Sequence, residues 1–295
     1  MRHRWPVSVL LALVLFVPAP AAAQQPQREP VRSITRLSGE LYRVQNNDHY
    51  TLFLVTPAGI ILTDPINVEL ATWLKAELTT RFPNNPVRYV LYSHHHQDHA
   101  SGAALFNDTA ELVGHENFNR DLKVSLARDP KRYTAVAPVE STYSGRRTVT
   151  LGGKTVNLVH PGPTAHATDF TVVHFPAERV VFGVDFMNVK MVPGTTMLAN
   201  GAPIQPYIDA VRAVEALDFD TVSPGHGLTG TKADLVAFRQ YYEHLQERVR
   251  AGIAKGQTPE QLQAAKIMDE YRDWIEYDED NDVNIANAYK TLSGK

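Results

Sequence analysis

The segment His94-His95-His96-Gln97-Asp98-His99 places four imidazoles and one carboxylate within six residues, in the pattern H-x-H-x-D-H. Polar side chains are costly to bury without partners, so such a cluster needs a reason. Neutral imidazole and carboxylate are the ligands that zinc and other borderline divalent metals select. The cluster therefore predicts a metal site, and its density of donors predicts a dinuclear one.

Three further polar residues stand where such a site would need them, each close to the end of an expected strand. His166 follows the loop 160–165, Asp185 follows the apolar residues 180–184, and His226 lies in Ser223-Pro224-Gly225-His226-Gly227. Loops at strand ends are where rigid scaffolds carry chemistry. None of the three indicates a site alone, but with the cluster they form one hypothesis.

The composition limits the chemistry that the chain can support. It has no cysteine, so its metal ligands are nitrogen and oxygen and it has no disulfides. The formal net charge is -3, and no block of lysine or arginine offers an electrostatic footprint for a phosphate backbone. We expect a small-molecule substrate and no nucleic-acid partner.

The first 23 residues predict a secretory signal peptide. Arg2 and Arg4 precede the apolar segment 7–17, and Ala21 and Ala23 precede a cleavage site before Gln24. The apolar segment is shorter than the roughly 20 residues that a membrane-spanning helix needs. We expect a periplasmic or secreted protein without a membrane anchor after cleavage, and a flexible tail over residues 24–35.

The remaining chain predicts one α/β domain over residues 36–295. Apolar patterning places strands at 41–43, 50–55, 60–62, 87–92, 148–151, 154–159, 170–175, 180–184 and 221–222, and helices at 67–81, 100–106 and 204–217, with further C-terminal helices from 231. Two halves that each supply strands and then helices predict two sheets packed face to face, with helices outside. The acidic segment 276–282 lacks the glycine and glutamate of a calcium loop and predicts a solvated loop.

Four motifs in this order resemble the metallo-β-lactamase superfamily. They are H-x-H-x-D-H, G-P-T-A-H-A-T-D at 162–169, F-G-V-D at 182–185 and S-P-G-H-G at 223–227. The resemblance implies a four-layer αβ/βα sandwich with two zinc ions at one edge. It implies that one ion is held by His94, His96 and His166, and the second by Asp98, His99 and His226. Asp185 then matches either a bridging aspartate or the cysteine ligand of another branch.

This arrangement predicts hydrolysis. Three neutral imidazoles leave zinc its full double charge and an open position, where the pKa of a bound water falls to about 7. We expect Asp98 and Asp185 to be the catalytic carboxylates, and Asp64 and Asp169 to accept hydrogen bonds from ligand imidazoles. The substrate is expected to be a compact carbonyl compound, namely a β-lactam-like amide, a lactone or a thioester.

The branch of the superfamily is left open by the motifs. They are most similar to those of subclass B1 β-lactamases, but Asp185 stands where that subclass has a cysteine, and Asn188 stands where its carboxylate-binding lysine falls. The aspartate instead resembles glyoxalase II enzymes and lactonases. A mononuclear iron enzyme similar to persulfide dioxygenases is an alternative, and a non-catalytic metal-binding protein is another.

Several neighbouring residues also have open roles. His160 could replace His166 as a ligand, and His95 is expected to have a surface or structural role. The segments 46–50, with His49 and Tyr50, and 186–197 could flank the substrate or be solvated turns. Pairing through Tyr241 or Trp274 is compatible with a homodimer.

Overall fold

The computed structural model describes residues 29–294, and residues from Val31 onward form one compact unit. The expected signal peptide, residues 1–23, lies outside the described residues. Strand β1 spans Arg32–Ser38 and pairs with β2. Residues 32–35 therefore belong to the first sheet, and the expectation of a flexible tail as far as residue 35 was wrong for these four residues.

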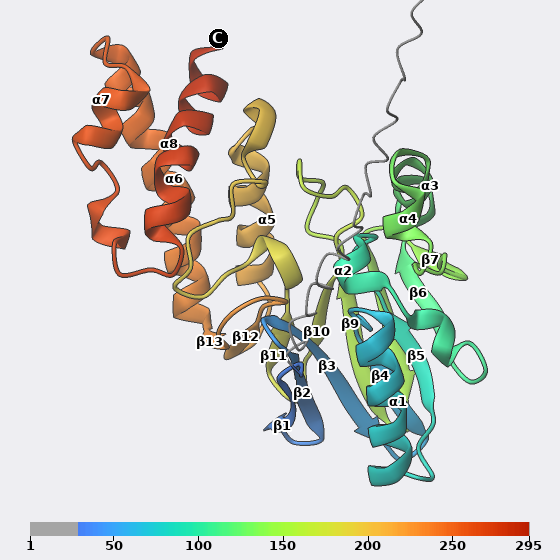
Figure 1. Cartoon of the computed structure of the whole chain (residues 1–295). Helices are drawn as coiled ribbons and strands as arrows, with labels where there is room; N and C mark the ends of the chain where they lie inside the picture. Colours follow the sequence, from blue (N-terminus) through green and yellow to red (C-terminus); the bar gives the residue numbers. More distant parts are fainter. Residues whose placement is uncertain (1–28, 295) are drawn as a thin grey trace, which may run out of the picture. The chain divides into compact units, whose positions relative to one another are not determined.

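The first sheet has seven strands in the order of the sequence (Figure 1). They are β1, β2 (Leu41–Asn46), β3 (His49–Thr56), β4 (Gly59–Leu62), β5 (Val87–Leu91), β6 (Glu111–His115) and β7 (Ser141–Tyr143). β1 to β4 are antiparallel neighbours, whereas β4 to β7 are parallel. Since parallel strands end at the same edge, the segments that follow β4 and β5 come together there.

The second sheet has six strands in the order β13-β12-β11-β10-β9-β8. Their bounds are β8 (Arg146–Leu151), β9 (Lys154–Val159), β10 (Val172–Phe175), β11 (Val180–Phe182), β12 (Thr221–Ser223) and β13 (Gly230–Thr231). Only β11 and β12 are parallel. The segments that carry Asp185 and His226 follow these two strands, so they emerge at one edge of this sheet.

Apolar side chains fill the space between the sheets and beneath the helices. Leu54 and Ile61 of the first sheet share a buried cluster with Val156 and Val173 of the second. On the other face of the first sheet, a separate cluster joins Leu70 and Leu74 of α1 (Val68–Arg81) and Phe118 of α3 (Phe118–Arg128). Helices α5 (Gln205–Glu215) and α6 (Lys232–Ala254) contribute to the cluster of the second sheet. The predicted four-layer sandwich is confirmed.

Local sequence explains where several helices begin. Asn67 caps α1 by accepting a hydrogen bond from the Leu70 N–H at 2.8 Å. Thr231 and Thr258 form capping boxes with Asp234 and Gln261 at the start of α6 and α7 (Pro259–Ala264). The remaining short elements are α2 (Gln97–Ala100), η1 (Ala103–Phe106), α4 (Pro130–Tyr133), η2 (Val184–Phe186), η3 (Ala199–Gly201) and η4 (Asp269–Tyr271).

Three further sequence-based expectations differ from the structure. The predicted helix at 100–106 is two short turns, because Gly102 at φ 94° interrupts it. The acidic segment 276–282 is mostly the start of α8 (Tyr277–Ser293), whose first turn carries Asp278, Glu279 and Asp280. Carboxylates near a helix N-terminus interact favourably with the helix dipole and stabilise the helix. An acidic segment is therefore compatible with a helix start as well as with a solvated loop.

The third difference concerns the expected homodimer contact. Tyr241 is completely buried and stacks against Trp274 with ring centroids 6.0 Å apart. Tyr241 therefore packs inside the chain and was the wrong residue for contacting a second copy.

Within residues 29–294, every helix is too short or too polar to span a bilayer.

Candidate metal centre

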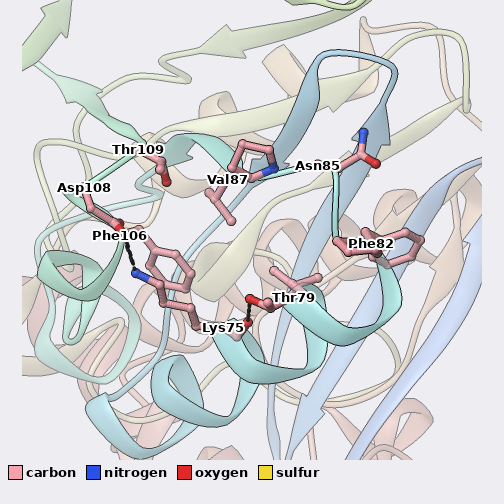
Figure 2. Close-up of a pocket in the computed structure, with 11 residues that line it drawn as sticks. Lys75, Thr79, Phe82, Asn85, Val87, Phe106, Asp108 and Thr109 are labelled. Atoms are coloured by element: carbon pink, nitrogen blue, oxygen red, sulfur yellow. Dashed lines mark hydrogen bonds and ion pairs between the residues drawn. The ribbon is translucent and has the colours of Figure 1, made fainter.

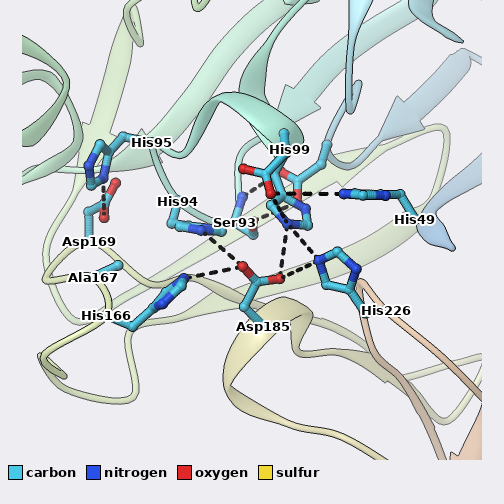
Figure 3. Close-up of polar contacts among 12 residues, drawn as sticks. His49, Ser93, His94, His95, His99, His166, Ala167, Asp169, Asp185 and His226 are labelled. Carbon is cyan, nitrogen blue, oxygen red and sulfur yellow. Dashed lines mark hydrogen bonds and ion pairs between the residues drawn. The ribbon is translucent and has the colours of Figure 1, made fainter. Parts of the chain in front are cut away.

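All seven predicted donor residues come from segments that follow strands or join them. His94 and His96 follow β5, and the short helix α2 carries Asp98 and His99. The other three donors are His166 between β9 and β10, Asp185 in the turn η2 after β11, and His226 after β12. Figure 3 shows histidines from these segments converging on Asp185. The structure thus brings together the residues that the sequence scatters over more than a hundred positions.

One group of donors consists of His94, His96, His166 and Asp185, with ligand atoms within 4.8 Å of one another. The Oδ2 atom of Asp185 lies 3.4 Å from Nε2 of His94 and 3.2 Å from Nε2 of His166. Two donors bound to one zinc ion at 2.0–2.1 Å with a tetrahedral angle are about 3.3 Å apart. The observed spacing matches that of ligands of a common ion.

The second group consists of Asp98, His99 and His226. The other oxygen of Asp185, Oδ1, faces this group at 2.9 Å from Nε2 of His99 and 3.4 Å from Nε2 of His226. The two Nε2 atoms are 3.3 Å apart. Asp185 therefore directs one oxygen to each group, which is the geometry of a bridging carboxylate.

Unpartnered polar atoms show that the site fits divalent ions. Among the described residues, the buried atoms Nε2 of His94 and Oδ1 of Asp185 have no hydrogen-bond partner. Leaving such atoms buried without a partner is costly. Imidazole and carboxylate donors of this kind suit zinc and similar ions, so the donor chemistry and the unpartnered atoms agree.

The electrostatics of the donors follow from burial and from their mutual contacts. Burial lowers the pKa of His94 to about 4, against the opposing pull of Asp185. Burial also disfavours a charged His99, but Asp185, Asp64 and Asp98 outweigh it and raise the pKa of His99 to about 9. For Asp185 itself, burial opposes ionisation, yet the charge of His99 and hydrogen bonds from neighbouring histidines hold its pKa well below the usual range.

Asp64 orients a ligand imidazole through an intervening serine. Its carboxylate accepts hydrogen bonds from the Ser93 N–H at 2.8 Å and from the Ser93 hydroxyl at 2.5 Å. Since that hydroxyl donates to Asp64, it accepts from Nδ1 of His94, 3.0 Å away. This chain of contacts leaves the lone pair of His94 Nε2 facing Asp185, as a metal-binding imidazole requires.

Asp169 contacts His95 instead of a ligand imidazole, so its expected role was wrong in detail. His95 Nδ1 lies 3.0 Å from Oδ1 of Asp169, and the two residues are 7% and 0% exposed. His95 thus has a structural position and is not on the surface. The pair joins the segment of His94 and His96 to the segment of His166, as does the hydrogen bond from Thr171 N–H to the Ser93 carbonyl at 2.7 Å.

A strained turn and a glycine allow Asp185 and His226 to approach each other. Val184 has φ 30°, a conformation that costs free energy for a β-branched residue. Its carbonyl accepts a hydrogen bond from the Gly225 N–H at 3.2 Å. A Cβ atom on Gly225 would lie 2.6 Å from Val184 Cγ2 and 3.0 Å from His99 Cε1. The glycine of the P-G-H-G motif is therefore required by close packing.

The structure also places two histidines whose roles the sequence left open. His160 stacks on His115 at 3.9 Å between ring centroids, and its Nδ1 lies 2.8 Å from the Phe170 carbonyl oxygen, so it stands apart from the donor groups. His49 lies at the site, with Nε2 3.8 Å from Oδ2 of Asp98. Sequence reasoning placed His49 only in a flanking segment. Its contact with His226 is an isolated backbone β-bridge between distant segments, which the local spacing of residues does not predict.

A separate pocket lies between α1 and η1 (Figure 2). Lys75 crosses it and contacts the Asp108 carboxylate at 3.0 Å, and Phe82 and Val87 supply apolar walls. None of the seven predicted donors lines this pocket. The chemistry of the candidate metal centre is therefore independent of it.

Comparison with protein families agrees with the motifs. Residues 67–226 match the family model of the metallo-beta-lactamase superfamily, which is more than half of the chain. The chain belongs to the metallo-β-lactamase superfamily. The matched region contains the histidine cluster and ends at His226, so all seven donors of this metallo-β-lactamase-fold protein lie inside it.

Solved structures resemble this superfamily member in fold. A metallo-beta-lactamase from Pontibacter korlensis has a TM-score of 0.59 and 19% identity, over 71% of this chain and 99% of that one. A stereoselective inverting sec-alkylsulfatase from Pseudomonas sp. has a TM-score of 0.70 and 16% identity, over 88% of this chain and 50% of that one. At these identities the comparisons show a shared fold.

One curated relative is similar in sequence. It is the 2,4-dinitroanisole O-demethylase subunit alpha of Nocardioides sp. (strain JS1661), 28% identical over 205 residues. The aligned region covers 67% of this metallo-β-lactamase-fold chain and 58% of the relative. The names of these proteins show that one superfamily fold carries several reactions.

Proposed function

We propose that this superfamily member is a dinuclear zinc-dependent hydrolase that opens a compact carbonyl substrate. The observation that supports it is the placement of Asp185, whose two oxygens face two separate groups of histidines. His94, His96 and His166 would hold one ion, and Asp98, His99 and His226 the other. The substrate classes are a β-lactam-like amide, a lactone or a thioester.

Divalent ions in this site would lower the pKa of a coordinated water and polarise the substrate carbonyl. On the side of the first ion the other donors are neutral imidazoles, so only the shared Asp185 carboxylate offsets the positive charge there. Asp98 has a side chain that is 36% exposed, so its carboxylate can also accept a hydrogen bond from a reacting water. Burial of Asp98 is outweighed by His49 and His99, and its lowered pKa keeps it ionised for that task.

The second donor group favours this proposal over a mononuclear iron oxygenase. A single-ion enzyme needs only the first group, whereas Asp98, His99 and His226 here form a second group with donor atoms within 4.8 Å. The carboxylate at position 185 favours the glyoxalase II and lactonase branches over subclass B1. Metal analysis of the purified protein decides between one ion and two.

We also propose that the protein is exported to the periplasm or secreted, which the charged and then apolar N-terminal segment supports. A small molecule reaching it there is the proposed partner. The names of the curated relative and of the sulfatase neighbour widen the set of substrates worth testing to an aryl methyl ether and a secondary alkyl sulfate.

A substrate panel tests the proposed function. Zinc-loaded protein is assayed with nitrocefin, a homoserine lactone, a glutathione thioester, 2,4-dinitroanisole and a secondary alkyl sulfate. We expect zinc-dependent turnover of a lactone, thioester or β-lactam that disappears with a chelator and in His96→Ala. Turnover confined to the ether or the sulfate would overturn the carbonyl assignment. No bound metal, together with stability that a chelator leaves unchanged, would overturn the proposed function as a whole.

A further inference from the structure

His49 stands beside the second donor group although no motif places it there. It begins strand β3, and an isolated bridge joins it to His226. The next residue strengthens this contact, since the Tyr50 N–H donates to the Gly225 carbonyl at 2.8 Å. The backbone itself therefore holds the His49 ring next to the His226 ring, with centroids 4.3 Å apart.

A partly buried arginine connects the same two segments. The guanidinium of Arg43 donates to the Gly227 carbonyl at 2.6 Å and lies 3.4 Å from the centre of the Tyr50 ring. These contacts tie the strand pair β2–β3 to the loop that carries His226. They fix the position of His49 more firmly than a solvated turn would.

The orientation of the His49 ring gives it a free donor atom. Nδ1 lies 3.1 Å from the Asp48 carboxylate, a hydrogen bond that Nδ1 donates. An imidazole that donates through Nδ1 leaves a lone pair on Nε2. In Figure 3 this side of the ring points toward the donor groups, and Nε2 lies 3.8 Å from Oδ2 of Asp98.

The distances around Asp98 suit shared ligands better than hydrogen bonds. Oδ2 of Asp98 lies between two imidazole nitrogens, 3.8 Å from His49 Nε2 and 4.0 Å from His99 Nε2. Both distances are too long for hydrogen bonds. Two donors that are each about 2.1 Å from one ion are separated by about 3.0–4.2 Å, depending on the angle between them.

We propose that His49 Nε2 is a further ligand of the second metal ion, in addition to Asp98, His99, His226 and the Asp185 bridge. The proposal rests on the dinuclear site of the proposed function. His226 belongs to two groups of donors, one with Asp98 and His99 and one with Asp48 and His49. The ligand atoms within each group lie within 4.8 Å of one another. The extra imidazole gives the second position five protein donors, more than the four of a tetrahedral zinc site. The second ion is then held more tightly and offers fewer open positions than the first.

Cobalt(II) titration of the metal-free full-length protein tests this proposal without relying on activity. The variants are His49→Phe, which keeps a ring without a donor, and His49→Gln. Tyr50→Phe is the matched control, because it is the neighbouring residue and keeps its ring beneath Arg43. Chelator competition gives the affinity of each cobalt ion, and visible absorption reports how many donors surround it.

We expect both His49 variants to bind the second cobalt ion about 10- to 100-fold more weakly, the range seen when ligand-supporting groups are lost, with the first ion unchanged. The absorption of the second ion should also increase, because cobalt absorbs more strongly with fewer donors. Wild-type affinity and spectrum in His49→Phe would overturn the proposal. If neither variant folds by circular dichroism, His49 is a folding residue and the proposal is also overturned. A wild-type protein that binds fewer than two ions would instead overturn the dinuclear function.

Discussion

Replacing Asp169 tests whether the His95–Asp169 pair holds the metal-binding segments in place. Asp169→Leu keeps the branching and the number of heavy atoms of the side chain but removes the acceptor 3.0 Å from His95 Nδ1. His95 is only 7% exposed, so water cannot replace that acceptor. Leaving a buried donor unsatisfied costs about 1–3 kcal/mol, and we expect a loss of about 2 kcal/mol in the free energy of unfolding.

Urea unfolding of the metal-free protein measures this loss directly. For domains of about 150–250 residues, a loss of about 2 kcal/mol in the free energy of unfolding lowers the Tm by about 4–8 °C. Asp169→Asn is the control, because its amide oxygen still accepts from His95 Nδ1 and most of the stability should remain. In a double-mutant cycle, His95→Phe combined with Asp169→Leu should lose less than the sum of the two single changes, since neither partner is left unpaired.

The reasoning would be refuted by a loss below about 0.5 kcal/mol in Asp169→Leu, the ordinary range for unimportant surface changes. Equal losses in the leucine and asparagine variants would also refute it, because the hydrogen bond would then not be the cause. Additive losses in the double mutant would show that the two side chains do not act as a pair.

Other changes probe the donors themselves. His96→Ala should abolish hydrolysis while far-UV circular dichroism stays unchanged, because one donor of the first ion is lost; normal turnover would count against the site. Asp185→Cys should raise β-lactam turnover if kinship with subclass B1 is functional, and should only destroy activity if the carboxylate bridge is required. In the metal-free protein His99 has a pKa of about 9 and is protonated at pH 7, so zinc binding must release a proton there. Calorimetry in buffers of different ionisation enthalpy should therefore show buffer-dependent heats at pH 7, and equal heats in all buffers would contradict this.

Much of the fold follows from local patterns. Short apolar segments such as 60–62 and 180–184 predicted buried strands. Residues 60–62 lie within β4, whereas β11 ends at Phe182 and Val184 begins the turn η2. The local sequence Thr258-Pro259-Glu260-Gln261 forms a capping box, and α7 begins at Pro259 directly after it. The prediction failed at residues 276–282, because their acidic side chains suit a helix N-terminus as well as a loop. Local composition does not choose between these two environments.

The sequence alone determined the donor types, the motif order and the absence of cysteine thiolate ligands, because these depend only on which residues occur and how they are spaced. Tertiary structure decided that each oxygen of Asp185 faces a different histidine group, that Asp169 pairs with His95, and that His49 adjoins Asp98. Each of these contacts joins segments from different strands. Their geometry depends on how two sheets pack and where their strands end, which no local periodicity encodes.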